Sequence, residues 1–448
     1  METFIAPLEE ATVKGGSAPI TGRHGLGASA SFLHTGAQAQ PLDSLLEQIQ
    51  ETADLPLAQG RTLPAAAYTS EEFLAWELKH VLGCDWLAVA HVSQIPTPGD
   101  FLNVELLGEP LIVVRGKDGG IRVLSRVCPH RAMDIMPPGF GYDGHGTGEI
   151  REGMPGCGHT RLFLCPYHHW TFDLDGRLKG CPEMHRAENF CRDEIGLKVF
   201  RSEVWEGFIF VNFSGAASPL QQQFRELQED IGGFHADEME VVIAKEWDCP
   251  FNWKVLVENF MEGYHHLGAH CKTLQVVMPA KNTWTAGERA HSMRVNLPFK
   301  DGFQGDAEVD FAPIPTLPED QRNQMSVYLG FPCFLLFTGP DRLFWYRIDP
   351  LSARRSKLLT TCLLPKSARQ DEMYASKLER AKKMLVDFHL EDMEVCTAVQ
   401  RGFETRGYQL GRLSHLEMPI WLIQRYLAAR IRDTYPTHDR PAAPPQRT

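Results

Sequence analysis

Two short stretches decide the fold of the first half of the chain: Arg-Val-Cys-Pro-His-Arg at residues 126–131 and Leu-Cys-Pro-Tyr-His-His-Trp-Thr-Phe-Asp at residues 164–173. Each stretch sets one cysteine close to one histidine, as C-x-H and C-x-x-H. Around them, from residue 86 to residue 213, short apolar runs alternate with turn signals such as Pro-Gly-Asp at 98–100. This pattern predicts a small antiparallel β domain that carries both stretches.

The two stretches supply two thiols and two imidazoles, which suit two kinds of metal site. Zinc accepts two cysteines and two histidines in a tetrahedral site. A Rieske [2Fe–2S] cluster instead binds two cysteines on one iron and two histidines on the other. The C-x-H spacing and the β context favour the cluster, with buried cysteines and hydrogen-bonded histidines as the metal-free alternative. A competing C-x-H at residues 157–159 leaves only five residues before Cys165, so we keep Cys128 and His130 as the first pair.

A second group of metal-binding side chains occupies residues 258–270, which read Glu-Asn-Phe-Met-Glu-Gly-Tyr-His-His-Leu-Gly-Ala-His. We expect a helix from residue 253 to residue 268. Three histidines and two carboxylates in thirteen residues exceed what a solvated helix face needs, although a helix with surface histidines is the alternative. Two histidines and one carboxylate are typical of non-haem Fe(II) sites that keep positions open for O2 and substrate. Ideal helix geometry would pair His266 with His270, because residues four apart share a face.

The carboxylate of such a site should come from the helix that we expect over residues 368–403. Its apolar stripe at helical spacing consists of Leu385, Phe388, Cys396 and Val399. Asp392 falls within this stripe, and a carboxylate on a buried face needs a cation to offset its desolvation. The other acids fall off the stripe and are expected to be solvated; they are Asp387, Glu391 and Glu394.

Composition excludes several classes of protein. The chain has 448 residues, 43% of them apolar and 23% charged, which is an ordinary globular balance. Lys and Arg total 45 against 57 Asp and Glu, so the net charge of −12 makes nucleic acid and anionic membranes poor partners. We find no apolar run long enough to span a bilayer and no signal peptide. The eleven cysteines are an odd number in a large chain, which favours reduced thiols in the cytoplasm over a secreted disulfide framework.

The cysteine–histidine stretches closely resemble the Rieske domains of aromatic ring-hydroxylating oxygenases, and residues 258–270 are similar to the iron site of the same family. The resemblance covers about residues 64–425. It implies a cluster bound by Cys128, His130, Cys165 and His168, and a mononuclear Fe(II) bound by His265, His270 and Asp392. By this resemblance His265, and not His266, is the first histidine ligand, and His266 becomes the second choice. The five-residue spacing from His265 to His270 would need a π-bulge or a helix end near Gly268.

The resemblance also implies roles for two residues that precede His265. Glu262 would bridge an iron-ligating histidine to the Rieske histidine of a neighbouring subunit, and Asn259 would support the site from one turn earlier. Many family members have Asp at the position of Glu262. Glu is more like the carnitine and choline monooxygenase group. Two further departures are the 34-residue segment 131–164, which is longer than usual and Gly-rich in its middle, and His169, which stands where glycine is common.

We expect an α+β protein with a flexible arm at residues 1–62, which contains one short helix at 42–52. A Rieske domain at residues 63–215 follows, with a leading helix at 70–82 that Ser70 caps. A helix-grip catalytic domain with the mononuclear iron, an antiparallel sheet plus helices, should occupy residues 216–430. Residues 431–448 contain four prolines and should form a disordered tail.

The expected function is that of a terminal oxygenase alpha subunit. It would use O2 and two electrons from a flavin and iron–sulfur reductase, with or without a ferredoxin, to hydroxylate or oxidatively demethylate a small organic substrate. An aromatic substrate is favoured, and a quaternary ammonium compound such as carnitine is the alternative. The aromatic-rich segment 325–348 should line part of the substrate site and otherwise form sheet core. A Rieske electron carrier and a zinc-stabilised binding module are the alternatives from other classes. The family commonly forms homotrimers, sometimes with a beta subunit.

Overall fold

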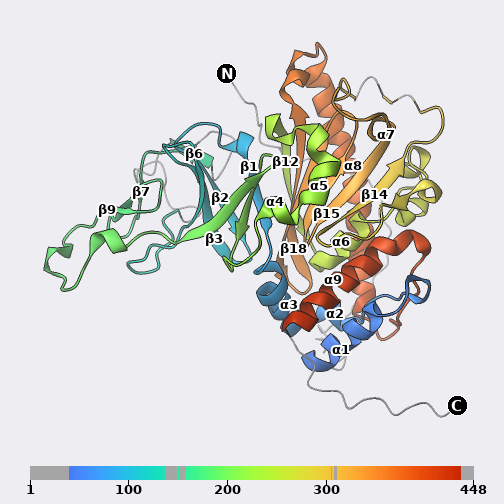
Figure 1. Cartoon of the computed structure of the whole chain (residues 1–448), viewed down its shortest axis with the longest axis horizontal. Helices are drawn as coiled ribbons and strands as arrows, with labels where there is room; N and C mark the ends of the chain where they lie inside the picture. Colours follow the sequence, from blue (N-terminus) through green and yellow to red (C-terminus); the bar gives the residue numbers. More distant parts are fainter. Residues whose placement is uncertain (1–39, 137–148, 151–156, 304, 307–309, 435–448) are drawn as a thin grey trace, which may run out of the picture.

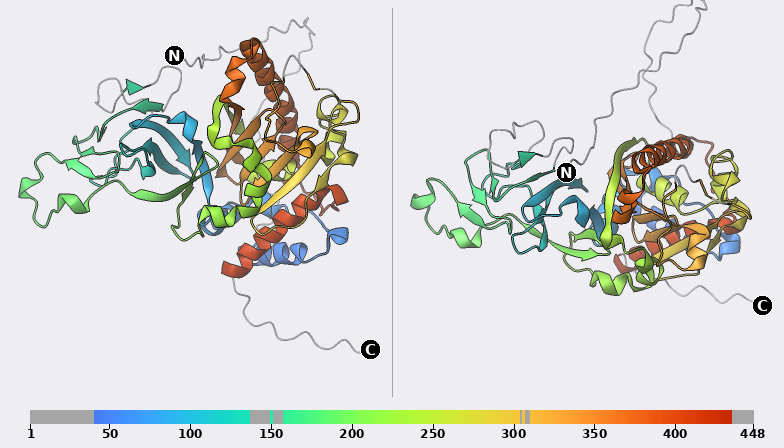
Figure 2. Two further views of the ribbon diagram at one scale, coloured as in Figure 1. Left: turned by 45° about the horizontal axis from the view of Figure 1, so that its top comes forward. Right: turned by 90° about the horizontal axis from the view of Figure 1, so that it is seen from above.

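The computed structural model describes residues 40–136, 149–150, 157–303, 305–306 and 310–434. Most of the expected N-terminal arm, the Gly-rich middle of segment 131–164 and most of the expected tail lie outside these residues. A β domain lies beside a larger domain of sheet and helices (Figure 1). Figure 2 shows the same two-part arrangement from two other directions. The predicted α+β fold is confirmed.

The β domain is built on an eight-stranded antiparallel sheet with the order β1-β11-β10-β4-β3-β2-β6-β5, and a separate three-stranded sheet, β7-β8-β9. Its strands are short, and turn residues separate them as the sequence predicts; Gly119, for example, adopts φ +80° between β3 and β4. The strands are β1 (Leu87–His91), β2 (Asp100–Leu106), β3 (Glu109–Arg115), β4 (Ile121–Ser125), β5 (Glu149–Ile150), β6 (Cys157–His159), β7 (Phe163–Leu164), β8 (Thr171–Phe172), β9 (Leu178–Gly180), β10 (Val199–Trp205) and β11 (Phe208–Asn212).

The larger domain contains a seven-stranded antiparallel sheet with the order β12-β18-β17-β16-β15-β14-β13. Its strands are β12 (Met239–Cys249), β13 (Trp284–Thr285), β14 (Ser292–Pro298), β15 (Gln324–Gly330), β16 (Phe334–Thr338), β17 (Leu343–Ser352) and β18 (Arg355–Pro365). Side chains alternate between the two faces of β17. Trp345 packs with Phe208 of the β domain, whereas Tyr346 packs with Phe260 on the opposite face. One face of the sheet therefore packs against the β domain and against the helical residues 220–231, and the opposite face meets the helix that ends at Phe260.

Helix α8 (Tyr374–Phe403) is the long helix that the sequence predicts. Leu385, Phe388 and Cys396 are buried, as the apolar stripe requires. Val399, which we also placed on the stripe, is 42% exposed. The buried face passes instead through Gln400, whose amide oxygen accepts a hydrogen bond from the backbone N–H of Asn252 at 2.9 Å.

Helix α6 (Trp253–Phe260) is much shorter than the expected helix over 253–268. A separate 3-10 turn, Tyr264–Leu267, follows it. Gly263 lies between them, where a Cβ atom would come within 2.7 Å of the Thr283 side chain. Tight packing at this glycine thus accompanies the end of α6. The following 3-10 turn ends at Leu267 with Gly268 as its cap, so a helical end near Gly268 is present, whereas the alternative, a π-bulge, is absent from this segment.

The helices that precede the β domain pack on the larger domain. Helix α1 (Leu42–Ala53) buries Leu45, Leu46 and Ile49 and lies beside α9 (Met418–Thr434) (Figure 1). The segment is therefore packed from residue 42 onward, and α9 extends into the expected tail. Helix α3 (Glu71–Glu77) begins where the Ser70 hydroxyl accepts the N–H of Phe73, as predicted, and a short π-helical turn, Leu78–Leu82, continues it.

The remaining helices of three turns or fewer are α2 (Ala66–Thr69), α4 (Leu220–Gln223), α5 (Arg225–Ile231) and α7 (Glu319–Arg322). Among the residues that the structure describes, no helix combines the length and the apolar character that crossing a bilayer would require.

Candidate metal centres

The first candidate centre is built from two loops with the same backbone pattern. In one loop the N–H of Ala132 donates to the carbonyl of Cys128 at 3.0 Å, and in the other the N–H of His169 donates to the carbonyl of Cys165 at 3.0 Å. Ala132 has φ +54° and His169 has φ +61°, both in the left-handed region. Glycine adopts this conformation without strain, which explains physically why glycine is common at the position of His169.

The two loops bring the four predicted side chains together. Cys128 and Cys165 are each 1% exposed. The imidazole rings of His130 and His168 lie 4.7 Å apart, and Trp170 stacks on His130 at 4.6 Å. His168 lies on the surface. The thiols thus face the interior and the imidazoles lie nearer to solvent, an arrangement that matches a cluster with one cysteine iron and one histidine iron.

The thiol chemistry of these loops also fits a metal group. Burial, together with the neighbouring Cys165, raises the pKa of the Cys128 thiol to about 11. A thiolate at this position is therefore costly unless a cation neutralises it. The competing Cys157-Gly158-His159 lies in strand β6, and His159 bonds to Asp100 through Nδ1 at 3.0 Å. The hydrogen-bond partner of His159 thus belongs to strand β2 and not to either of the two loops. The structure therefore favours Cys128 and His130 as the first pair.

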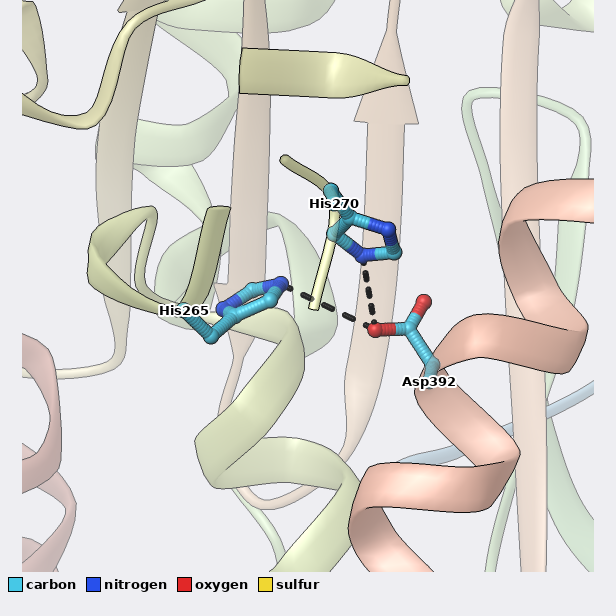
Figure 3. Close-up of side chains that lie close together, drawn as sticks. All are labelled: His265, His270 and Asp392. Atoms are coloured by element: carbon cyan, nitrogen blue, oxygen red, sulfur yellow. Dashed lines mark hydrogen bonds and ion pairs between the residues drawn. The ribbon is translucent and has the colours of Figure 1, made fainter. Parts of the chain in front are cut away.

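The second candidate centre combines His265 and His270 from the segment after α6 with Asp392 of α8 (Figure 3). Asp392 Oδ1 lies 2.9 Å from His270 Nε2 and 3.7 Å from His265 Nε2. One ligand atom from each of the three residues lies within 4.8 Å of the others. Two ligands about 2.1 Å from an ion and at right angles would lie about 3 Å apart, so this donor set fits a mononuclear metal ion with open positions.

A carboxylate accepts a hydrogen bond from the outer nitrogen of each histidine. Glu262 Oε1 lies 2.7 Å from His265 Nδ1, and Glu391 Oε2 lies 2.6 Å from His270 Nδ1. A carboxylate on Nδ1 keeps the proton there and leaves Nε2 free to bind a metal. Both histidines are therefore held in the tautomer that a metal site needs.

The two carboxylates are themselves held in place. The second oxygen of Glu262 accepts the backbone N–H groups of Tyr264 and His265, which open the 3-10 turn. The oxygen of Glu391 that faces His270 also accepts the Thr273 hydroxyl at 2.7 Å. We expected Glu391 to be solvated, and this expectation is wrong. Helical periodicity alone places Glu391 on the solvated face of the helix. Its position directly beside Asp392 was the one feature of the sequence that could have indicated a role at the site.

Asp392 is ionised in this arrangement. Burial by itself raises the pKa of its carboxyl, but the adjacent His270 and His265 lower it more, and the net shift is downward. Asn259 Nδ2 also donates to Asp392 Oδ1 at 2.8 Å. The side chain that we placed one turn before Glu262 thus orients the carboxylate and not a histidine.

His266, the second choice for a ligand, has a different partner. Its Nδ1 lies 3.0 Å from the carbonyl oxygen of Met278, and its ring is 3% exposed. Burial lowers the pKa of His266 to about 4, so the ring is neutral. Because α6 ends early, the four-residue pairing of His266 with His270 on one helix face does not form, and the geometry favours His265.

A pocket borders this donor set. Seven apolar side chains line it together with eight polar residues, which are Asn259, Glu262, His265, His266, His270, Tyr346, His389 and Asp392. Of the aromatic residues in segment 325–348 only Phe337 and Tyr346 line it. Tyr328, Phe334 and Trp345 lie in the core between the sheet and the β domain, as expected for most of this segment.

Comparison with known proteins decides the family. Residues 85–200 match the Rieske [2Fe-2S] domain family, and residues 236–433 match the catalytic domain of the ring hydroxylating alpha subunit family. The chain belongs to the Rieske non-haem iron oxygenases, as an alpha subunit. The oxygenase therefore carries a Rieske [2Fe–2S] cluster and a mononuclear iron, which confirms both predicted cofactors. The electron-carrier and zinc-module alternatives are set aside.

Individual relatives of the oxygenase come from more than one branch of the family. It is 26% identical over 357 residues to the carnitine monooxygenase oxygenase subunit of Acinetobacter pittii, covering 78% of this chain and 86% of the relative. Its fold is similar to that of a quaternary ammonium Rieske monooxygenase, with a TM-score of 0.71, 22% identity and coverage of 85% and 98% of the two chains. Naphthalene 1,2-dioxygenase from Rhodococcus sp. also has a TM-score of 0.71, with 18% identity and coverage of 88% and 100%. The fold therefore does not discriminate between substrate classes.

Proposed function

We propose that this oxygenase is a monooxygenase for a small quaternary ammonium compound, which it hydroxylates or oxidatively demethylates with O2 and two electrons from a separate reductase. The observation that carries the proposal is the group of His265, His270 and Asp392 beside a pocket whose walls are largely aromatic and apolar. The reductase would carry flavin and an iron–sulfur centre, with or without a ferredoxin between the two proteins.

In this proposal each polar residue of the site has a separate task. His265 and His270 would hold the ferrous ion through Nε2, and Asp392 would hold it through its carboxylate. When bound, the iron activates O2 with electrons that the Rieske cluster delivers. Glu262 and Glu391 would keep the two histidines in the metal-binding tautomer, and Asn259 would keep Asp392 directed at the ion. Cys128, His130, Cys165 and His168 would hold the cluster.

Three observations favour an ammonium substrate. The relative from Acinetobacter pittii is named for carnitine. Glu262 stands where many ring-hydroxylating members have Asp. The pocket offers four aromatic rings, from Phe260, Phe337, Tyr346 and Phe388, and no Lys or Arg among the described residues that line it. Aromatic rings attract ammonium cations through their π faces, and the absence of lining Lys and Arg removes a source of repulsion.

A planar aromatic substrate, the class that we expected from the sequence, is the second candidate. The same four rings and the apolar side chains beside them would stack on an aromatic compound without any charge complement. His266 and His389 are both neutral, because burial lowers the pKa of each to about 4, so the wall contains little charge away from the metal ligands.

Metal analysis and a substrate panel test the proposal. The purified protein should contain three irons and two acid-labile sulfides per chain. Pre-reduced protein should then be mixed with 18O2 and a panel of trimethylammonium compounds and aromatic compounds, with product detected by mass spectrometry. One labelled oxygen atom in an ammonium-derived product supports the proposal. Turnover of aromatic compounds alone would establish the second candidate, and two labelled atoms in one product would contradict monooxygenation.

A further inference from the structure

One polar side chain in the pocket wall has no task in the function proposed above. His389 lies on α8, three residues before Asp392, and lines the pocket. Residues three apart on a helix share a face, so its ring lies on the same side of α8 as the metal-binding carboxylate. It is 0% exposed, and neither ring nitrogen has a hydrogen-bond partner among the described residues.

The surroundings of His389 explain why its nitrogens lack partners. Its ring centroid lies 4.3 Å from that of Trp247 and 6.0 Å from that of Tyr346, so two aromatic rings pack against it. The indole N–H of Trp247 donates to the Thr360 hydroxyl at 3.0 Å and is not available to the imidazole. A buried polar group without a partner is costly and uncommon, and one that lines a pocket can be satisfied by a molecule bound there.

The other buried histidines show that this state is specific to His389. Within the pocket, His265 and His270 each bond to a carboxylate, and His266 bonds to the Met278 carbonyl. Outside it, His91 is also 0% exposed, but its Nδ1 lies 2.9 Å from the Ser93 hydroxyl and its Nε2 lies 3.0 Å from the Ala236 carbonyl.

The charge of the pocket limits what could satisfy His389. A buried carboxylate of a substrate would need a cationic partner, and the described residues that line the pocket include no Lys or Arg. Burial keeps the His389 ring neutral by lowering its pKa to about 4. A neutral imidazole has one donor nitrogen and one acceptor nitrogen. It therefore suits a neutral group that can accept or donate one hydrogen bond.

We propose that His389 is a specificity-determining residue that binds a neutral hydrogen-bonding group of the substrate, such as a hydroxyl, one helical turn from the metal site. The inference rests on the function proposed above and deepens it. For an ammonium substrate it selects an alcohol over a compound whose carboxylate must enter the pocket. For an aromatic substrate it selects a phenol or an aromatic alcohol over the hydrocarbon.

The test uses two pairs of probes with the full-length protein, loaded with cluster and iron. One pair is a trimethylammonium alcohol and the alkyltrimethylammonium ion in which a methyl group replaces the hydroxyl. The second pair is naphthol and methylnaphthalene. Binding is measured by titration calorimetry on the wild type, on His389→Phe and on His389→Leu, which serves if Phe does not fit. His91→Phe is the matched control, because it removes a buried histidine whose two nitrogens are both bonded.

The expected result has two parts. In the His389 variants, Kd for the hydroxylated probe rises at least ten-fold, whereas Kd for its methyl analogue changes less than two-fold. The melting temperature of the same variants stays equal to that of the wild type or rises, because no protein hydrogen bond is lost, whereas His91→Phe melts lower and keeps the wild-type preference between probes.

Several results would overturn the proposal. An equal change in Kd for both members of a pair would mean that His389 only packs against the substrate. A fall in melting temperature as large as in His91→Phe would mean that the ring has a structural partner. Failure of the wild type to bind either hydroxylated probe would also overturn it. Binding of the naphthol pair alone would refute the ammonium substrate and still decide the role of His389.

Discussion

Each histidine proposed to bind the iron is oriented by a carboxylate at its outer nitrogen, and the two carboxylates reach the site by different routes. Glu262 comes from the segment before His265, and its second oxygen caps the turn that carries this histidine. Glu391 comes from α8, next to Asp392. One short run of α8 thus supplies both a direct ligand and the group that orients another ligand, so a rotation of this helix would disturb both.

The neighbouring histidines should respond to substitution in opposite ways. His265→Ala should lose the mononuclear iron, so that iron content falls from three to two per chain while the visible Rieske spectrum is unchanged. His266→Ala should keep three irons but melt at a lower temperature, because the buried Met278 carbonyl loses its partner, at a cost of about 1–3 kcal/mol. Iron analysis and thermal melts measure both effects. Loss of iron in His266→Ala with retention in His265→Ala would refute the assignment.

Glu262→Gln should separate iron binding from electron transfer. The glutamine amide cannot accept both the His265 ring N–H and the two backbone N–H groups through oxygen atoms as the carboxylate does. We expect iron affinity to fall about 10–100-fold, so the site fills only with excess Fe(II). In the filled protein the reduced cluster should pass its electron to the iron very slowly, because the charged bridge between the two centres is lost.

Stopped-flow oxidation of the pre-reduced, iron-filled Glu262→Gln protein by O2 with substrate measures that step. Glu262→Asp is the matched control, since it keeps the charge and is the residue that many family members have. Oxidation of Glu262→Gln at the wild-type rate would show that electrons reach the iron by a different route.

At the scale of elements, the amino-terminal helices α2 and α3 hold α6 through two polar contacts. Lys254 and Glu77 form a fully buried ion pair at 2.8 Å that ties α6 to α3. The Tyr68 hydroxyl of α2 donates to Glu258 of α6 at 2.7 Å. The amino-terminal helices therefore fix the helix from which the iron-binding segment departs, although they precede the β domain in the chain.

Glu258 should make stability depend on pH. Burial raises its pKa from 4.5 to about 7, in spite of the Tyr68 hydrogen bond and the nearby Lys254, both of which lower it. A raised carboxyl pKa contributes stability that is present below about pH 4.5 and is lost as pH rises through about 7. Glu258→Gln stays neutral, so its melting temperature relative to the wild type should increase from pH 5 to pH 8.

Thermal melts at half-unit steps of pH test this dependence, with the exposed Glu47→Gln as the control for loss of one charge. A difference between Glu258→Gln and the wild type that is the same at every pH would show that Glu258 is ionised throughout this range.

At the scale of the whole molecule, the cluster loops and the iron site lie in different domains. Strands β7 to β9, which flank the second cysteine–histidine loop, lie at the end of the β domain away from the catalytic domain (Figure 1). His265 and Asp392 lie beside α6 and α8 in the catalytic domain. This separation favours an electron route from one subunit's cluster to its neighbour's iron.

We therefore expect a homotrimer in solution, in which each cluster passes electrons to the iron of the next subunit. The sequence of this chain does not indicate whether a beta subunit is also part of the assembly. Multi-angle light scattering of the purified holoprotein should give about three times the mass of one chain, and activity should fall on dilution in parallel with dissociation. A monomer with full activity would refute both the trimer and the route through Glu262.

The local patterns of the sequence were sufficient for much of this protein. The cysteine–histidine spacings, the short strands around them and the histidine-rich segment 258–270 predicted an antiparallel β domain, an iron-binding domain and the cofactors that the family match confirms. Asp392 followed from its place on the apolar stripe of α8. The fold and cofactor predictions succeed because chain spacing and periodicity limit which side chains can share a loop or a helix face. The assignment of Asp392 as an iron ligand stays a prediction.

The family resemblance already placed His265 ahead of His266, and the tertiary structure supports that choice. The contact between Glu391 and His270 came from the tertiary structure alone. The placement of His265 and His266 depends on where α6 ends, and that end lies close to the tight packing of Gly263 against Thr283. The same holds for His389, whose isolation results from Trp247 and Tyr346 of two separate strands. Long-range packing overrides the local helical pattern here because the contacts that control each side chain come from residues that are remote in sequence.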